Sequence, residues 1–224
     1  MSIICATPKT GVLVPIPQCP LYTATLALQN ARCVIYYLHK ESNWSTNSDG
    51  IREVLKKAQK EGIDVRAVVV ISPGNPNGAS LKAKAINAVL ELAAEEKLTN
   101  IFEGELYSFK KGLRDLQESE KNKDGKFDNI KLANLHSISK GMAGECGYRG
   151  GYYVIVGFDP EVVAQIYKFV SIMIYSPGPG QCTVKMIVNP SKEGELSYPL
   201  YREEYDFIFN SLRDRAQALY KAFK

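Results

Sequence analysis

Residues 65–78, VRAVVVISPGNPNG, decide the fold class of this 224-residue chain. The run VRAVVVI at 65–71 is apolar on both faces, as is typical of a strand buried in a parallel sheet. The turn residues of SPGNPNG at 72–78 end this strand, and a helical pattern follows at 80–97. Further strands are expected at 11–16, 33–38 and 152–156, and further helices at 20–30, 49–61 and 160–172. Strands that alternate with helices predict an α/β fold with a mixed, mostly parallel sheet flanked by helices.

The alternation is interrupted after Lys97. Residues 98–111, LTNIFEGELYSFKK, contain no run of four aliphatic residues, so no buried strand is predicted there. Residues 118–129 are polar and predict an exposed loop. The chain ends in a long helix at 199–224, whose apolar residues recur at intervals of three and four and form one stripe. That stripe needs a partner surface.

Composition excludes several classes of function. The net charge of +4 is mild and the basic residues are scattered, which argues against a nucleic-acid binder. Only two histidines are present, so a His-rich metal site is not expected. The five cysteines form no CxxC pair and are interpreted as free thiols of a reducing compartment. The first residues do not resemble a signal peptide, and no apolar stretch is long enough to span a membrane. A cytoplasmic location is therefore expected, or a mitochondrial one if a longer form carries a presequence.

The segment HSISKGMAGECGYRGGYYV, residues 136–154, carries the strongest chemical signal. Five glycines within residues 141–151 oppose a helix and suit a backbone that passes close to a ligand. A partly desolvated Lys140 would be a nucleophile toward an aldehyde. Arg149 would clamp a phosphate, and Ser137 would donate a hydroxyl to it. The alternative for the isolated motif is a solvated turn with an ordinary surface lysine.

Two other segments end strands of the predicted sheet. SPGNPNG places Asn75 at the carboxyl end of strand 65–71, where open α/β sheets bind ligands. PIPQCPLY, residues 15–22, follows strand 11–16 and reaches the same edge. Taken alone, each segment also reads as an ordinary turn.

Together these segments resemble the class I, fold-type-I aminotransferases, and most closely their alanine aminotransferase branch. The motif S-x-S-K-G-x-x-G-E-C-G-Y-R-G-G is long and specific, and the similarity covers nearly the whole chain from about residue 8. The segments that carry the resemblance are GVLVPIPQCPLYTATLAL (11–28), SPGNPNG (72–78), SISKGMAGECGYRGGY (137–152), FDPEVVAQIYKFVSI (158–172) and SYPLYREEYDFIFNSLRDRAQALYKAF (197–223). The resemblance implies the large domain of this fold, over residues 1–198, with the small domain largely absent and residues 199–224 leading toward it.

The resemblance also implies a cofactor, pyridoxal 5′-phosphate, and a role for each site residue. Lys140 would form the internal aldimine and then move the substrate proton as base and acid. Arg149 and Ser137 would hold the phosphate, and Asn75 would bond the ring oxygen and contact substrate. Tyr22 would lie near the substrate. The same resemblance implies amino-acid and 2-oxo-acid substrates, namely alanine and 2-oxoglutarate. It also implies a homodimer.

The sequence departs from the family pattern at several points. An internal deletion is expected to remove the strand before F-x-G-E-x-x-S-F-K-K, and with it the aspartate that pairs with the cofactor's ring nitrogen and a nearby tyrosine. The sheet is then expected to be gapped or re-registered at this place. Cys19 stands where the family has an aromatic stacked on the ring, and Asn77 replaces a threonine. Both ends resemble truncations. A catalytically silent relative, which binds cofactor weakly or pairs with a full-length subunit, is therefore the second hypothesis. An unrelated nucleotide-binding module is disfavoured because no GxGxxG or Walker A pattern follows a strand.

Overall fold

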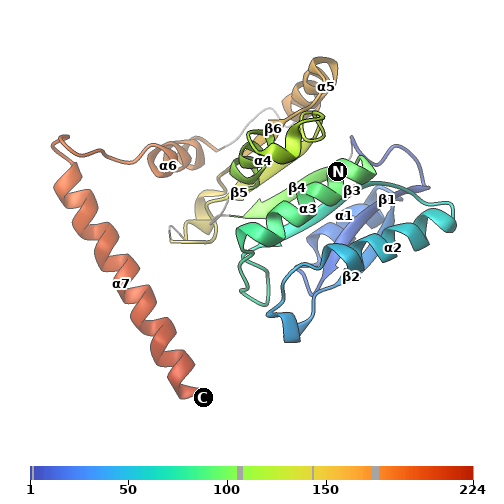
Figure 1. Cartoon of the computed structure of the whole chain (residues 1–224). Helices are drawn as coiled ribbons and strands as arrows, with labels where there is room; N and C mark the ends of the chain where they lie inside the picture. The colour runs from blue at the N-terminus through green and yellow to red at the C-terminus, as the bar shows by residue number, and fades with distance from the viewer. Residues whose placement is uncertain (2, 105–107, 143, 173–176, 224) are drawn as a thin grey trace. The chain divides into compact units, whose positions relative to one another are not determined.

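A computed structural model describes residues 1, 3–104, 108–142, 144–172 and 177–223, and Figure 1 shows its elements. Over this part of the chain the strands form one six-stranded sheet in the order β2-β1-β3-β4-β5-β6. The pairs β1/β2, β1/β3, β3/β4 and β4/β5 are parallel, which confirms the mostly parallel sheet. The strands are β1 (Thr10–Ile16), β2 (Arg32–Tyr37), β3 (Asp64–Ser72), β4 (Thr99–Gly104), β5 (Leu132–Ser137) and β6 (Gly151–Val156).

Helices connect these strands and follow them. They are α1 (Leu21–Leu28), α2 (Ser48–Lys60), α3 (Ala83–Glu96), α4 (Phe109–Gln117), α5 (Pro160–Ser171), α6 (Gly178–Val188) and α7 (Tyr198–Ala222). The predicted helices are present, but two start differently from their expected bounds. Asn47 caps α2, because its side chain accepts a hydrogen bond from the Asp49 amide. The α3 helix begins at Ala83, because the Leu81 amide donates to Ser72 Oγ (2.9 Å) and holds the preceding residues extended.

The apolar core lies on both faces of the sheet. Alternate residues of β1 point to opposite sides, so Leu13 belongs to one cluster while Val12 and Val14 belong to the other. The first cluster packs α2, α3 and α4 against one face, and the second packs α1 against the other. The buried side chains of β3 contribute to both clusters in the same alternating way. Helices therefore flank the sheet on both faces, as the sequence predicts.

The prediction of no buried strand after Lys97 is wrong, although the family's stretch before this segment is absent from the sequence. Residues Thr99–Gly104 form β4, paired in parallel with β3 on one side and with β5 on the other. Its alternation places Ile101 in the α1-side cluster and Phe102 in the other cluster, where Phe102 stacks on Phe109 with 4.3 Å between ring centroids. Three consecutive buried residues suffice for this short strand, so a run of four aliphatics is not required. The sheet is therefore continuous from β3 through β4 to β5.

The chain divides into two compact units. Unit 1 comprises Met1–His136 and Tyr153–Ile174, and unit 2 comprises Ser137–Tyr152 and Tyr175–Lys224. The polar segment at 118–129 is mostly exposed, as expected, although Phe127 is buried in the core of unit 1. A division into a large domain over residues 1–198 and a helix leading to a small domain remains a prediction.

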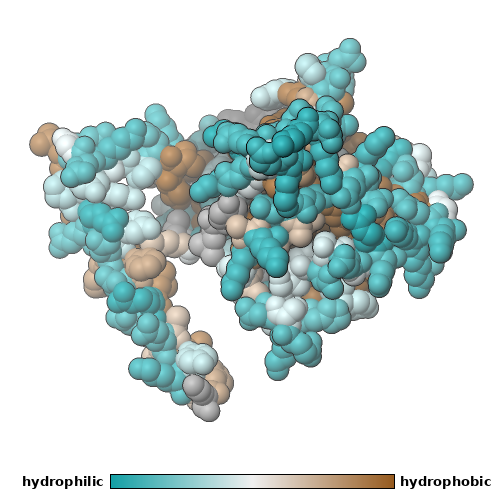
Figure 2. Space-filling model, in the orientation of Figure 1, coloured by the Kyte–Doolittle hydropathy of each residue, from teal (hydrophilic) through white to brown (hydrophobic). Residues whose placement is uncertain are grey.

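The long α7 helix of unit 2 runs from Tyr198 to Ala222, which confirms the terminal helix, and residue 224 of the predicted span lies outside the described residues. No described residue of α7 is buried, and Figure 2 shows apolar side chains on its surface. The helix thus carries the predicted apolar stripe, and none of its described residues is buried. None of the described helices is long and apolar enough to cross a membrane.

Candidate functional site

The carboxyl ends of β1, β3 and β4 lie at one edge of the sheet in unit 1, because these strands are parallel. The segment with Cys19 and Tyr22 follows β1, and the turn with Asn75 follows β3. Glu103, the fifth residue of β4, lies opposite Ile71 of β3. The structure thus brings three of the residues singled out in the sequence to one edge and adds a carboxylate that the sequence reasoning did not anticipate.

Tyr22 and Glu103 form the main polar contact of this edge. Tyr22 is 6% exposed, and its hydroxyl donates to Glu103 Oε2 at 2.8 Å. Burial, followed by the charge and hydrogen bond of Glu103, raises the pKa of the Tyr22 hydroxyl above its usual value. The hydroxyl therefore stays protonated and keeps donating. This bond ties α1 to the carboxyl end of β4.

The chain between β1 and α1 contains a second polar feature. Cys19 is half-buried and is a free thiol. Its neighbour Gln18 carries a buried Oε1 atom that has no hydrogen-bond partner among the described residues. A buried acceptor without a hydrogen-bond donor lowers the stability of the folded state. A ligand with a donor at this edge would relieve that cost.

The turn after β3 is held by its own backbone. The Gly74 amide donates to the Ala79 carbonyl oxygen at 2.9 Å, and the Gly78 amide donates to the Gly74 carbonyl oxygen at 2.8 Å. Asn77 Oδ1 accepts from the Ala79 amide at 3.1 Å, so Asn77 is used inside the turn. Asn75 is exposed and has no hydrogen-bond partner among the described residues. Its side-chain amide is available to a ligand.

The lysine segment belongs to unit 2 and forms a closed loop after β5. The Ile138 amide donates to the Gly150 carbonyl oxygen at 3.3 Å, and the Glu145 amide donates to the Ile138 carbonyl oxygen at 2.9 Å. Ile138 is 1% exposed and anchors the loop. Ser137 Oγ accepts from the Ser139 amide at 3.2 Å. Lys140 is exposed, so the described residues do not supply the desolvation that the sequence suggests.

Arg149 lies at the other end of the same loop. Its backbone φ is +53°, and its Nη1 atom donates to the Cys146 carbonyl oxygen at 3.0 Å. Within unit 2, Arg149 lines a cavity of about 380 Å³ together with residues of α6 from Gly180 to Val188. A Cβ on Gly180 would lie 2.4 Å from the Tyr148 carbonyl oxygen, so glycine permits the close packing of α6 on the loop. An exposed guanidinium beside a cavity suits an anionic group.

These side chains fit the chemistry of pyridoxal phosphate. Unit 1 provides the free Asn75 amide, the Glu103 carboxylate and the orphaned Gln18 acceptor. Unit 2 provides the Lys140 amine and the Arg149 guanidinium, on one loop with Ser137 at its start. Taken unit by unit, the Lys140 amine of unit 2 suits an aldehyde and its Arg149 guanidinium suits a phosphate, while the Asn75 amide of unit 1 suits a ring oxygen. Among the described residues, no group of three or more His, Cys, Asp or Glu side chains is suited to a metal ion.

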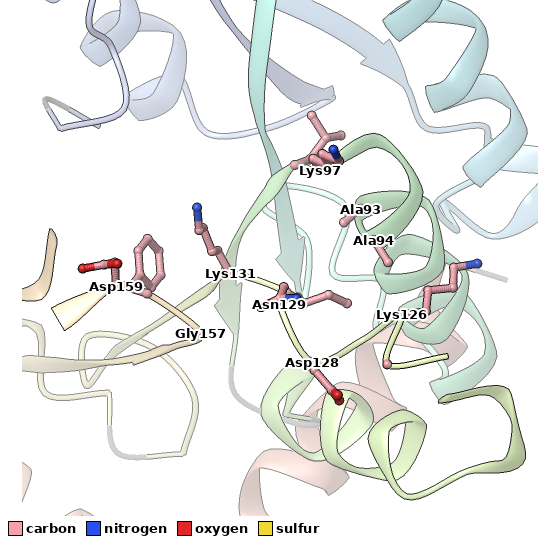
Figure 3. A pocket seen from close by; sticks show the side chains of 13 residues that line it. Ala93, Ala94, Lys97, Lys126, Asp128, Asn129, Lys131, Gly157 and Asp159 are labelled. Atoms are coloured by element: carbon pink, nitrogen blue, oxygen red, sulfur yellow. The ribbon is translucent and has the colours of Figure 1, made fainter. Parts of the chain in front are cut away.

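A cavity of about 790 Å³ lies at the opposite edge of the sheet in unit 1, beside the residues that precede β4 and β5. Figure 3 shows the ammonium groups of its Lys126 and Lys131 pointing in different directions. Lys126 pairs with Glu95 at 2.8 Å, and Asp159 accepts from the Glu161 amide to cap α5. These side chains serve the fold and do not converge on one point. The cavity is therefore not the candidate site.

Comparison with known proteins finds aminotransferases. The family model for class I and II aminotransferases matches residues 1–224. The mitochondrial alanine aminotransferase of Saccharomyces cerevisiae is 46% identical over 100% of this chain and 39% of its own length. A second protein of that yeast, described as an inactive alanine aminotransferase, is 45% identical over 100% of this chain and 46% of its own length. The chain thus spans less than half the length of these curated relatives.

Solved structures share the fold. An alanine aminotransferase from Pyrococcus furiosus has a TM-score of 0.72 at 22% identity, over 98% of this chain and 52% of that protein. An aspartate aminotransferase from Thermus thermophilus, solved with maleate, has a TM-score of 0.73 at 16% identity over the same shares of the two chains. At such identities the likeness establishes the fold alone.

Proposed function

Because the chain belongs to the family of class I and II aminotransferases, we propose that it transfers an amino group between alanine and 2-oxoglutarate, with pyridoxal phosphate held on Lys140. Pyridoxal phosphate is the cofactor of this family. The observation that carries the proposal is the loop after β5, which the Ile138–Gly150 hydrogen bond closes with Lys140 and Arg149 on one short segment. The 46% identity to a yeast alanine aminotransferase supports the choice of substrates.

Each residue has a defined task in this proposal. Pyridoxal phosphate supplies an aldehyde and an electron-withdrawing ring. Lys140 would hold the aldehyde of the cofactor through its amine, and the same amine would accept a proton from the substrate α-carbon and return it. Arg149 and Ser137 bind the phosphate. Asn75 would donate to the ring oxygen, and Cys19 would lie beside the ring.

In this proposal Tyr22 lies near the substrate. Its hydroxyl donates to Glu103 Oε2. The proposal includes a homodimer, a cytoplasmic location, a role in amino-acid biosynthesis, and small-molecule amino-acid and 2-oxo-acid partners. It also includes the division into a large domain over residues 1–198 and a helix, 199–224, that leads to a small domain.

The second candidate is a catalytically silent relative that binds the cofactor weakly or pairs with a full-length subunit. Two observations favour it. Lys140 is exposed, and one of the similar yeast proteins is described as inactive.

A half-reaction separates the two candidates. We expect the full chain, loaded with pyridoxal phosphate and freed of excess cofactor, to release one pyruvate per bound cofactor when alanine is added, as the amino group passes to the cofactor. Addition of 2-oxoglutarate should then yield an equal amount of glutamate. Pyruvate is measured with lactate dehydrogenase, and D-alanine serves as the control. Bound cofactor without pyruvate would refute the aminotransferase and support the silent relative.

A further inference from the structure

The α7 helix, Tyr198–Ala222, carries an apolar stripe that is open to solvent. Ile208 is 43% exposed, Leu212 47% and Leu219 61%, and no described residue of the helix is buried. At about 100° per residue, the stripe occupies one face of the helix. An exposed apolar stripe of this length marks an interaction surface. Its members are Tyr201, Tyr205, Ile208, Leu212, Ala216, Leu219 and Phe223, the last just beyond the helix.

Charge is distributed unevenly along the same helix. The half from Tyr198 to Asn210 contains one arginine against three carboxylates, which gives a net charge of −2. The half from Ser211 to Ala222 contains three basic residues against one carboxylate, which gives a net charge of +2. An antiparallel partner of the same sequence brings the acidic half of each helix against the basic half of the other. The helix is thus electrostatically complementary to a second copy of itself.

The charges that flank the stripe repeat this complementarity at the level of single residues. Viewed down the helix axis, Glu204 and Arg215 lie about 20° apart on one side of the stripe, and Asp206 and Arg213 lie about 20° apart on the other side. In an antiparallel pair, each side of one helix faces the same side of its partner. Asp206 already pairs with Arg202 at 2.6 Å, whereas Glu204 and Arg215 have no ion-pair partner among the described residues.

Full overlap of two α7 helices brings Glu204 and Arg215 together. When Tyr198 of one copy lies opposite Ala222 of the other, Glu204 lies within one residue of Arg215 of the second copy. The two-fold axis repeats this contact at the other end of the pair. Two intermolecular ion pairs therefore follow from one register.

The same register also matches the other flank and the stripe. Asp206 lies within one residue of Arg213 of the second copy, and Ile208 lies opposite Leu212. Apolar and charged positions thus agree on one antiparallel alignment over the whole helix.

We propose that two copies of this chain associate through α7 in antiparallel orientation, with their apolar stripes in contact and Glu204 of each copy paired with Arg215 of the other. The interface uses the same surface on both copies, so it closes at the dimer. The inference rests on α7 alone and is independent of cofactor binding.

The test measures the mass of the full chain by size-exclusion chromatography with multi-angle light scattering, over a series of protein concentrations. We expect a dimer for the wild type. Glu204→Arg sets arginine against Arg215 at both ends of the pair and should raise the dissociation constant at least about tenfold. Adding Arg215→Glu to this variant exchanges the two charges and should restore association. A parallel pair would not respond in this way, because Glu204 would already face a like charge.

Two further variants give the result its meaning. Glu203→Arg makes the same charge change one residue away, on the side of the helix opposite the stripe, and should leave the dissociation constant unchanged. Leu212→Glu places a charge inside the stripe and should give a monomer. Far-ultraviolet circular dichroism verifies that each variant keeps the helix content of the wild type.

Three results would overturn the proposal. A wild type that is monomeric at every concentration would leave the stripe to a different partner, such as further residues of a longer chain. A dimer that Glu204→Arg and Leu212→Glu leave intact would place the contact on another surface. Dissociation by Glu204→Arg without recovery in the double variant would contradict the antiparallel alignment. The proposed amino-group transfer is judged separately, by the release of pyruvate.

Discussion

Replacement of Lys140 with alanine is expected to abolish the borohydride-stable adduct between the chain and pyridoxal phosphate. The reason is chemical: a covalent link to the aldehyde requires an amine, and alanine has none. The loss should be complete at the mapped site, whereas non-covalent binding through Arg149 and Asn75 weakens less. Intact-mass spectrometry after reduction measures the adduct directly.

The matched control is Lys168→Ala, which removes an exposed lysine of α5. It should leave the adduct at the wild-type level. An adduct of the same yield in Lys140→Ala would mean that surface lysines react without selection. The solvated-turn interpretation of residues 136–154 would then hold.

Replacement of Phe102 with alanine is expected to destabilise unit 1 by about 3–5 kcal/mol, the usual range for a buried phenylalanine. Phe102 is 1% exposed and stacks on Phe109 between the sheet and α4. Its removal leaves a cavity at the centre of the cluster that joins β4 to three helices. Urea unfolding, followed by circular dichroism, measures the loss as a fall in the midpoint.

Phe207→Ala is the corresponding control, because Phe207 lies on α7 and is 74% exposed. It should change the free energy of unfolding by less than about 0.5 kcal/mol. Equal midpoints for the two variants would show that Phe102 is not buried. The assignment of Thr99–Gly104 as a strand would then be refuted, and with it the position of Glu103 at the edge of the sheet.

The fold was largely predictable because its strongest signals are local. The β3 strand is apolar on both faces, and glycine, proline or asparagine residues end it, so its place inside a parallel sheet follows from the residues themselves. The β4 strand was missed because only its central residues are buried and because Thr99, Glu103 and Gly104 have low apolar character. Its pairing with β3 and β5, a non-local property, decides its conformation.

The candidate site was predictable in part for the same reason. Lys140 and Arg149 stand in a motif long enough to identify, and Asn75 stands in a turn that follows an evident strand. Glu103 carries no motif, and its significance comes only from the register that brings it opposite Ile71 and within hydrogen-bond distance of Tyr22. Asn100, Ile101, Phe102 and Glu103 read as polar, apolar, apolar and polar, which is no period-two pattern, so the local sequence gives no signal for Glu103.

Exposure was the least predictable property. The glycine-rich loop suggests a desolvated lysine, yet Lys140 is exposed. The stripe of α7 suggests a partner surface, and the described residues provide none. Burial of a side chain depends on what lies opposite it, and neither local spacing nor composition specifies that.

Site mapping of the reduced adduct on the wild-type chain tests the central claim most directly. The protein is mixed with pyridoxal phosphate at equal concentration, reduced with borohydride, digested and analysed by peptide mass spectrometry. The account predicts one dominant modified peptide, with the cofactor on Lys140. No adduct, or adducts spread evenly over exposed lysines such as Lys168 and Lys221, would contradict it.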